Sequence, residues 1–114
     1  MSPRDDQRRL QDMQEAIERI ERYANEGRDT FATNELVQTW VIHHLQIIGE
    51  AAARISDNLK SKHPEIPWKA ITGMRNILVH DYFGIDVDIV WQAVAQNIPA
   101  LKQHLAKISP TEKN

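Results

Sequence analysis

The fold of this chain depends most on residues 36–59, which read LVQTWVIHHLQIIGEAAARISDNL. Its apolar side chains recur every three or four residues, which is the period of an α-helix. One stripe has the narrow spacing of a coiled-coil seam: Val41, Leu45, Ile48, Ala52, Ile55 and Leu59. A second row lies on a neighbouring face: Leu36, Trp40, Ile47 and Ala51. We therefore predict one helix that starts near Thr33–Asn34, which can cap it, and runs to about Leu59.

Two apolar faces on one helix predict packing in two directions. One face suits the core of the chain itself, and the other suits a second subunit, so we favour a homodimer. A central position of this helix in a small bundle is the alternative, and the pattern leaves it open.

The flanking sequence predicts three further helices. The first covers about residues 5–26 and ends at Glu26–Asp29, where Gly27 suits the C′ position. Its apolar stripe is Leu10, Met13, Ile17, Ile20 and Ala24. The third helix follows the connector at residues 60–67, with Pro67 in its first turn, and its stripe is Trp68, Ile71, Met74 and Leu78.

The fourth helix is capped by Asp86 or Asp88. Its stripe is Val90, Val94, Ile98, Leu101, Leu105 and Ile108. Pro99 interrupts this stripe and predicts a kink or two abutting segments. No strand-like alternation occurs, so the predicted fold is all-α, an up-and-down bundle of four main helices. We expect a single domain over residues 1–114, with an ordered core at about 5–108.

Composition limits the possible functions. The chain has 114 residues, a formal charge of −2 and no cysteine, which excludes disulfides and zinc–thiolate sites. Because the net charge is slightly negative, RNA binding would need a local basic patch or two copies of the chain. The charged N-terminus lacks the apolar run of a signal peptide, and no stretch approaches the ~18 apolar residues of a membrane span. We expect a cytoplasmic protein.

Residues 75–82, RNILVHDY, carry the chemistry. The guanidinium of Arg75 matches a phosphate group, and His80 is the side chain best suited to proton transfer near neutral pH. This pair is the minimum equipment for RNA cleavage without a metal. On a continuous helix the two residues would lie about 140° apart. Either the helix loosens, Arg75 reaches across, or two subunits share the site, and we favour the last.

A purely structural role for these residues is the plain alternative. Arginine commonly forms an ion pair, and a half-buried histidine commonly forms a hydrogen bond. Glu50 could pair with Arg54 four residues later, or it could approach residues 75–82 in the fold. His43 and Glu50 share a helical face, but two such residues are a weak basis for a metal site, and we predict none.

Residues 66–86, IPWKAITGMRNILVHDYFGID, resemble the HepT-type branch of the HEPN superfamily. Residues 48–56, IGEAAARIS, and the pair Val90–Trp91 resemble it as well, and the likeness covers about residues 8–107. The resemblance implies a dimerising helical bundle that acts as a metal-independent endoribonuclease, the toxin of a type II toxin–antitoxin pair. It also implies a minimal nucleotidyltransferase antitoxin that silences the toxin by transferring AMP to Tyr82 and can join it in a higher complex.

The resemblance also assigns roles to residues. Arg75 would hold the scissile phosphate, and His80 would act as general base or acid. Asn76 would orient the imidazole or bind phosphate. Apart from the resemblance, the residue pattern itself makes Asp81 and Glu50 supporting candidates. The implied products are a 2′,3′-cyclic phosphate and a 5′-hydroxyl, with no cofactor. The approach of RNA could be lined by four basic residues: Arg54, Lys60, Lys62 and Lys69.

Two other functions remain compatible with the sequence. The chain could be a non-catalytic helical partner of a nucleotidyltransferase, with residues 75–82 as the substrate for AMP transfer or as a nucleotide-binding surface. It could also be a plain dimeric adaptor, which would tolerate alanine at Arg75 and His80.

Overall fold

The computed structural model describes residues 3–76 and 86–108, and these residues form helices and no strand. In chain order the α-helices are α1 (Pro3–Ala24), α2 (Arg28–Thr33), α3 (Glu35–Ala53), α4 (Asp57–Lys62), α5 (Trp68–Thr72), α6 (Val87–Gln92) and α7 (Ile98–Ala106). A 3₁₀-helix, η1 (Gly73–Asn76), follows α5, and a π-helical segment, η2 (Ala93–Asn97), joins α6 to α7. The predicted all-α fold is confirmed. No helix of the described residues is long and apolar enough to cross a bilayer.

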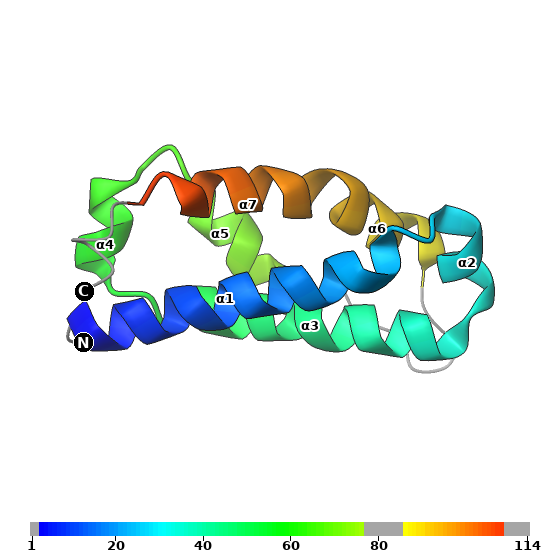
Figure 1. Ribbon diagram of the computed structural model, residues 1–114. Helices are drawn as coiled ribbons and strands as arrows, with labels where there is room; N and C mark the ends of the chain where they lie inside the picture. The colour runs from blue at the N-terminus through cyan, green and yellow to red at the C-terminus, as the bar shows by residue number, and fades with distance from the viewer. Residues whose placement is uncertain (1–2, 77–85, 109–114) are drawn as a thin grey trace.

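The helices are arranged as an up-and-down bundle (Figure 1). Helices α1 and α3 run side by side in opposite directions, and α5 with η1 packs against α3. The rod formed by α6, η2 and α7 returns along α1. Helix α3 therefore lies between α1 and the α5–η1 segment.

The core consists of the predicted stripes. The α1 residues from Leu10 to Ile20 in the stripe are buried, and Ala24 is partly buried. The seam of residues 41–59 and the stripe of residues 90–108 are buried throughout. Asp86 caps α6 by accepting a hydrogen bond from the backbone N–H of Ile89 at 3.2 Å, and Asn34 caps α3 through Val37. Asp88 instead forms an ion pair with Arg28.

The long second helix is wrong as predicted, because α3 ends at Ala53 and α4 begins at Asp57. Ser56 caps α4 by accepting a hydrogen bond from the backbone N–H of Leu59. Buried Asp6 on α1 accepts two further bonds, from Ser56 N at 2.8 Å and from Ser56 Oγ at 2.5 Å. The break is thus fixed by a carboxylate 50 residues away in the chain, which local periodicity cannot reveal.

The end of the first helix also differs from the prediction. Helix α1 ends at Ala24, and the short helix α2 follows. Its six residues are too few for a helical period to be recognised in the sequence. Gly27 adopts φ 90° and occupies the N-cap of α2 rather than the C′ position of α1. Phe31 anchors α2 in the core.

The predicted third helix is shorter and tighter. Helix α5 covers five residues, Pro67 is its N-cap rather than part of its first turn, and Arg75 and Asn76 lie in the 3₁₀-helix η1. Because a 3₁₀-helix has three residues per turn, the angle argued for a continuous α-helix does not apply there. Leu78 lies outside the described residues. In the fourth helix, η2 precedes Pro99, so two abutting segments are confirmed.

Candidate functional site

Arg75 is held against α3 by an unusually close approach of two backbones. A Cβ atom built on Gly49 would lie 2.5 Å from the backbone nitrogen of Arg75 and 2.8 Å from its Cβ. It would also lie 3.0 Å from the carbonyl oxygen of Thr72. Only a residue without a side chain fits at this contact, so Gly49 allows η1 to lie directly on α3.

Glu50, the next residue on α3, forms an ion pair with Arg75. The distance from Arg75 Nη1 to Glu50 Oε1 is 3.5 Å, and the two side chains are 41% and 57% exposed, respectively. The sequence left two partners open for Glu50, namely Arg54 and residues 75–82, and in the structure Glu50 pairs with Arg75. An exposed pair stabilises a fold by only ~0–1 kcal/mol. Its main effect is to limit where the guanidinium points.

The other predicted site residues are placed only in part. Asn76 follows Arg75 in η1 and is exposed. His80, Asp81 and Tyr82 lie outside the described residues. The structure therefore places Arg75, Asn76 and Glu50 at the contact between η1 and α3.

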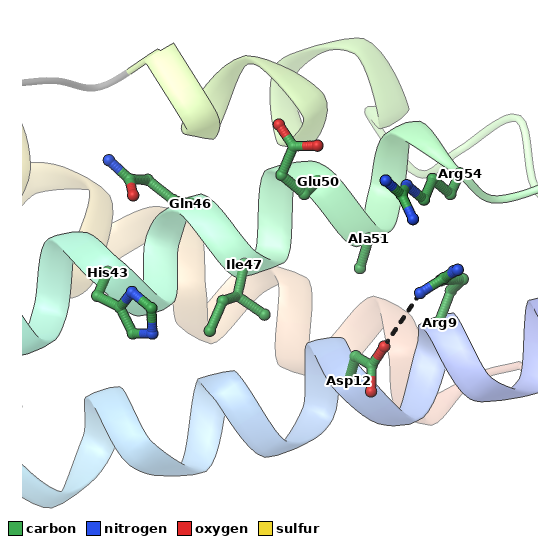
Figure 2. Close-up of a pocket in the computed structure, with 8 residues that line it drawn as sticks. All are labelled: Arg9, Asp12, His43, Gln46, Ile47, Glu50, Ala51 and Arg54. Atoms are coloured by element: carbon green, nitrogen blue, oxygen red, sulfur yellow. Dashed lines mark ion pairs between the residues drawn. The ribbon is translucent and has the colours of Figure 1, made fainter.

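A pocket of about 380 Å³, lined mostly by polar and charged residue types, lies beside this contact in the groove between α1 and α3 (Figure 2). Glu50 forms its rim towards η1, and Arg54 and Arg9 lie together at one end, near Ala51. His43 lies at the opposite end. The full lining is Arg9, Asp12, His43, Gln46, Ile47, Glu50, Ala51 and Arg54. One arginine of the pocket, Arg9, pairs with Asp12 at 3.6 Å.

The remaining basic residues expected on the RNA approach do not line this pocket. Lys60 and Lys62 belong to α4 and Lys69 to α5. His43 and Glu50 do line it, and within residues 3–76 and 86–108 no three acidic or histidine side chains gather as a metal site would require.

His44 is a structural histidine of the core. It is 3% exposed, and its Nδ1–H donates to the carbonyl oxygen of Trp40 at 2.7 Å. Burial lowers the pKa of His44, and nearby His43 and Arg19 lower it further, while the bond to Trp40 acts in the opposite direction. The uncharged form of the His44 ring is therefore favoured, and the ring packs on that of Trp40.

Two residues at the site were not singled out by the sequence analysis. Gly49 sits in the middle of a predicted helix, where glycine is unfavourable. That unfavourable position was a usable signal of close packing. Arg9 gave no signal, because an arginine on the polar side of an amphipathic helix looks like any other.

Comparison with known proteins identifies the family. A family model described as Ribonuclease HepT-like matches residues 13–108. The chain is 43% identical over 100 residues to "Probable ribonuclease HepT" of Thermococcus cleftensis, covering 87% of this chain and 91% of that protein. It is 36% identical over 106 residues to "Putative RNase MJ1380" of Methanocaldococcus jannaschii, covering 92% and 97%.

A third relative is "Putative RNase TTE0752" of Caldanaerobacter subterraneus, which is 34% identical over 101 residues, with 89% and 90% covered. No solved structure gives a significant match. The matched segment contains both Arg75 and the α3 residues on which it rests. The chain belongs to the HepT-like ribonuclease family.

Proposed function

We propose that this protein is a metal-independent endoribonuclease that cleaves RNA with Arg75 and His80. Its membership of the HepT-like family supports a ribonuclease. The observation that carries the proposal is the placement of Arg75. Its guanidinium is partly exposed, is held by Glu50, and lies beside a charged pocket.

The proposed reaction needs one cation and proton transfer. His80 removes the proton from a ribose 2′-hydroxyl, and the 2′-oxygen attacks the neighbouring phosphorus. The bond from phosphorus to the 5′-oxygen breaks, and a second proton donor, such as His80 of the other subunit, protonates the leaving oxygen. Arg75 stabilises the charge that develops on the phosphate oxygens. The products are a 2′,3′-cyclic phosphate and a 5′-hydroxyl.

The supporting residues have distinct proposed tasks. Glu50 limits the orientation of Arg75, as the 3.5 Å pair indicates. Asn76 is exposed next to Arg75 and can donate to a phosphate oxygen or orient the imidazole. Asp81 is proposed to support His80.

We propose that the protein works as a homodimer. The second apolar row of α3 is the supporting feature. Its first residue, Leu36, is 82% exposed, and Trp40 is partly buried, whereas Ala51 at the other end of the row is buried within the chain itself. A hollow of about 510 Å³ lies at this row and is mainly apolar, lined by Tyr23, Asn34, Leu36, Val37, Thr39, Trp40 and His43. Pairing of two copies would cover it.

We also propose a toxin role in a type II toxin–antitoxin system, with a minimal nucleotidyltransferase as antitoxin. AMP transfer to Tyr82 would add a negative phosphate and a bulky base close in sequence to Arg75. Both effects oppose RNA binding, the first by neutralising the arginine and the second by filling space. Phenylalanine at position 82 should abolish modification by the partner. A Tyr82→Phe protein that is still modified and silenced would rule out this site.

The deciding experiment is incubation of total RNA with the purified, unmodified protein in EDTA. We expect cleavage with cyclic-phosphate ends, lost in folded His80→Ala and Arg75→Ala variants. Arg75→Ala should lower the rate by roughly 10²–10³-fold, as removal of a transition-state donor commonly does. Loss of cleavage in EDTA would contradict the mechanism. No cleavage by protein whose mass shows an unmodified Tyr82 would favour the non-catalytic partner of a nucleotidyltransferase.

A further inference from the structure

The pocket between α1 and α3 has an unequal distribution of charge. Its two carboxylates are both engaged by arginines: Asp12 by Arg9 at 3.6 Å, and Glu50 by Arg75 at 3.5 Å. Arg54 has no ion pair to any part of the chain that the structure describes. The end of the pocket near Ala51 therefore carries excess positive charge from Arg54, which lies beside Arg9 (Figure 2).

Arg9 shows a second sign of an unmet partner. Its Nε atom is buried and has no hydrogen-bond acceptor within residues 3–76 and 86–108. A buried N–H without an acceptor is unfavourable, and such groups commonly mark a place where a ligand or water completes the bonding. The acceptor that best fits two neighbouring guanidinium groups is a phosphate oxygen.

We propose that Arg9 and Arg54 form a subsite for an RNA backbone phosphate adjacent to the scissile one. This proposal rests on the proposed ribonuclease function and names how its substrate is held. Arg54 is the C-cap residue of α3, so its backbone is fixed by bonds to the carbonyl oxygens of Ala51 and Ala52. Arg9 extends from α1 on the opposite side of the groove. The two arginines thus approach one anion from two rigid helices.

The spacing along α3 links this subsite to Arg75. Glu50, which holds Arg75, and Arg54 are one helical turn apart, about 6 Å along the axis. A strand whose scissile phosphate lies at Arg75 can therefore continue along the rim of the pocket to Arg54. The phosphate would compete with Asp12 for Arg9, since the Arg9–Asp12 pair is long and partly exposed.

The experiment measures binding separately from cleavage. A fluorescein-labelled single-stranded RNA is titrated with full-length His80→Ala protein, and anisotropy gives the Kd at several salt concentrations. Arg54→Gln and Arg9→Gln are added singly to this background. Arg22→Gln is the matched control, because Arg22 is an exposed arginine on the same helix as Arg9 but lies outside the pocket. Circular dichroism confirms that each variant is folded.

We expect Arg54→Gln and Arg9→Gln each to raise Kd about tenfold, and Arg22→Gln to change it far less. Each lost phosphate contact should also reduce the slope of log Kd against log salt by about 0.7. Arg54→Lys should recover part of the affinity, because it keeps the charge and loses the planar fork. Asp12→Asn should strengthen binding, because it releases Arg9.

Single-stranded DNA of the same sequence distinguishes a phosphate contact from one to the ribose hydroxyl. The ratio of affinities between parent and Arg54→Gln proteins should be the same for DNA and RNA, because a phosphate subsite ignores the 2′-hydroxyl. If Arg54→Gln weakened the binding of RNA but not the binding of DNA, the proposed phosphate contact would be wrong.

The subsite and the ribonuclease can fail separately. Suppose that the wild-type protein cleaves RNA, while Arg54→Gln and Arg9→Gln in the His80→Ala background bind RNA like Arg22→Gln. The proposed subsite is then wrong and the proposed ribonuclease activity stands. If the wild-type protein cleaves no RNA, yet Arg54→Gln and Arg9→Gln weaken RNA binding more than Arg22→Gln does, the groove binds phosphate and the catalytic proposal is wrong.

Discussion

Glu50 and Arg75, 25 positions apart in the chain, form an ion pair of 3.5 Å across the contact between α3 and η1. The contact exists because Gly49, directly before Glu50, has no side chain to separate the two backbones. Helix α3 thus supplies both the seat of Arg75 and the carboxylate that orients it.

Glu50→Gln tests whether this pair positions Arg75. We expect kcat for RNA cleavage to fall roughly tenfold, less than the ~100-fold that a 1 Å misplacement can cost. The melting temperature should hardly change, because the pair is exposed. Steady-state kinetics on a fluorogenic RNA and a thermal melt check both statements. A Glu50→Gln protein with unchanged kcat would show that Glu50 has no positioning role, whereas Glu50→Asp should retain part of the rate.

Gly49→Ala tests the close approach of the backbones. The added methyl would meet backbone atoms of Arg75 and Thr72, so we expect a loss of about 1–3 kcal/mol in unfolding free energy and a lower cleavage rate. Gly73→Ala is the control, because a Cβ there meets nothing within 4 Å and its φ is −64°. Urea denaturation of both variants gives the comparison. Equal stabilities would mean that η1 shifts freely on α3.

Leu36→Glu tests the proposed dimer. We expect the substitution to weaken association and shift the protein to a monomer, because a charge would replace an exposed apolar side chain in the second row of α3. Ile89→Glu is the control, since Ile89 is another exposed large apolar residue, 53% exposed on α6. Light scattering after size-exclusion chromatography measures the mass. A wild-type monomer, or equal masses for both variants, would count against this surface.

Asp6→Ala tests the contact that separates α3 from α4. We expect it to cost about 1–3 kcal/mol, because Ser56 loses acceptors for both its N–H and its hydroxyl. Ser56→Ala should be destabilising too, and the two losses should not add, since both residues belong to one network. Urea denaturation of the single and double variants measures the coupling. Glu18→Ala, an exposed change on the same helix, should be close to neutral.

His44 predicts a pH dependence of stability. Its pKa in the folded protein lies below its ordinary value of 6.5, chiefly because the ring is buried. The unfolded chain then binds a proton more readily than the folded one. The contribution of the neutral His44 ring to stability is therefore complete above pH 6.5 and is lost as the pH falls through the lowered pKa. His44→Gln should therefore lose less stability than wild type between about pH 7.5 and about pH 5. Urea denaturation of both proteins at the two pH values checks this.

Much of the core was predictable from local sequence. The stripes on residues 10–20, 41–59 and 90–108 are buried as the three- and four-residue spacing indicates. Asn34 and Asp86 cap the helices that follow them, because a cap depends only on residues two or three positions away. The abutting segments before α7 follow from Pro99, which cannot continue a regular helix.

The misses share a different origin. The break after Ala53 depends on Asp6, far away in the chain, and the seam residues Ile55 and Leu59 are buried on either side of it. The 3₁₀-helix at Arg75 was also missed, because the apolar spacing around it fits a longer α-helix equally well. Local patterns report which side chains face the core, and they do so whether the backbone is one helix or two.

The all-α class, the buried stripes and the choice of Arg75 as a candidate site residue follow from the amino-acid sequence, because periodicity and residue chemistry are local properties. The contacts of Gly49 and Glu50 with Arg75, and the meeting of Arg9 and Arg54 across a groove, depend instead on how the helices pack. Those relationships join helices remote in sequence, and they depend on interhelical distances that no single segment encodes.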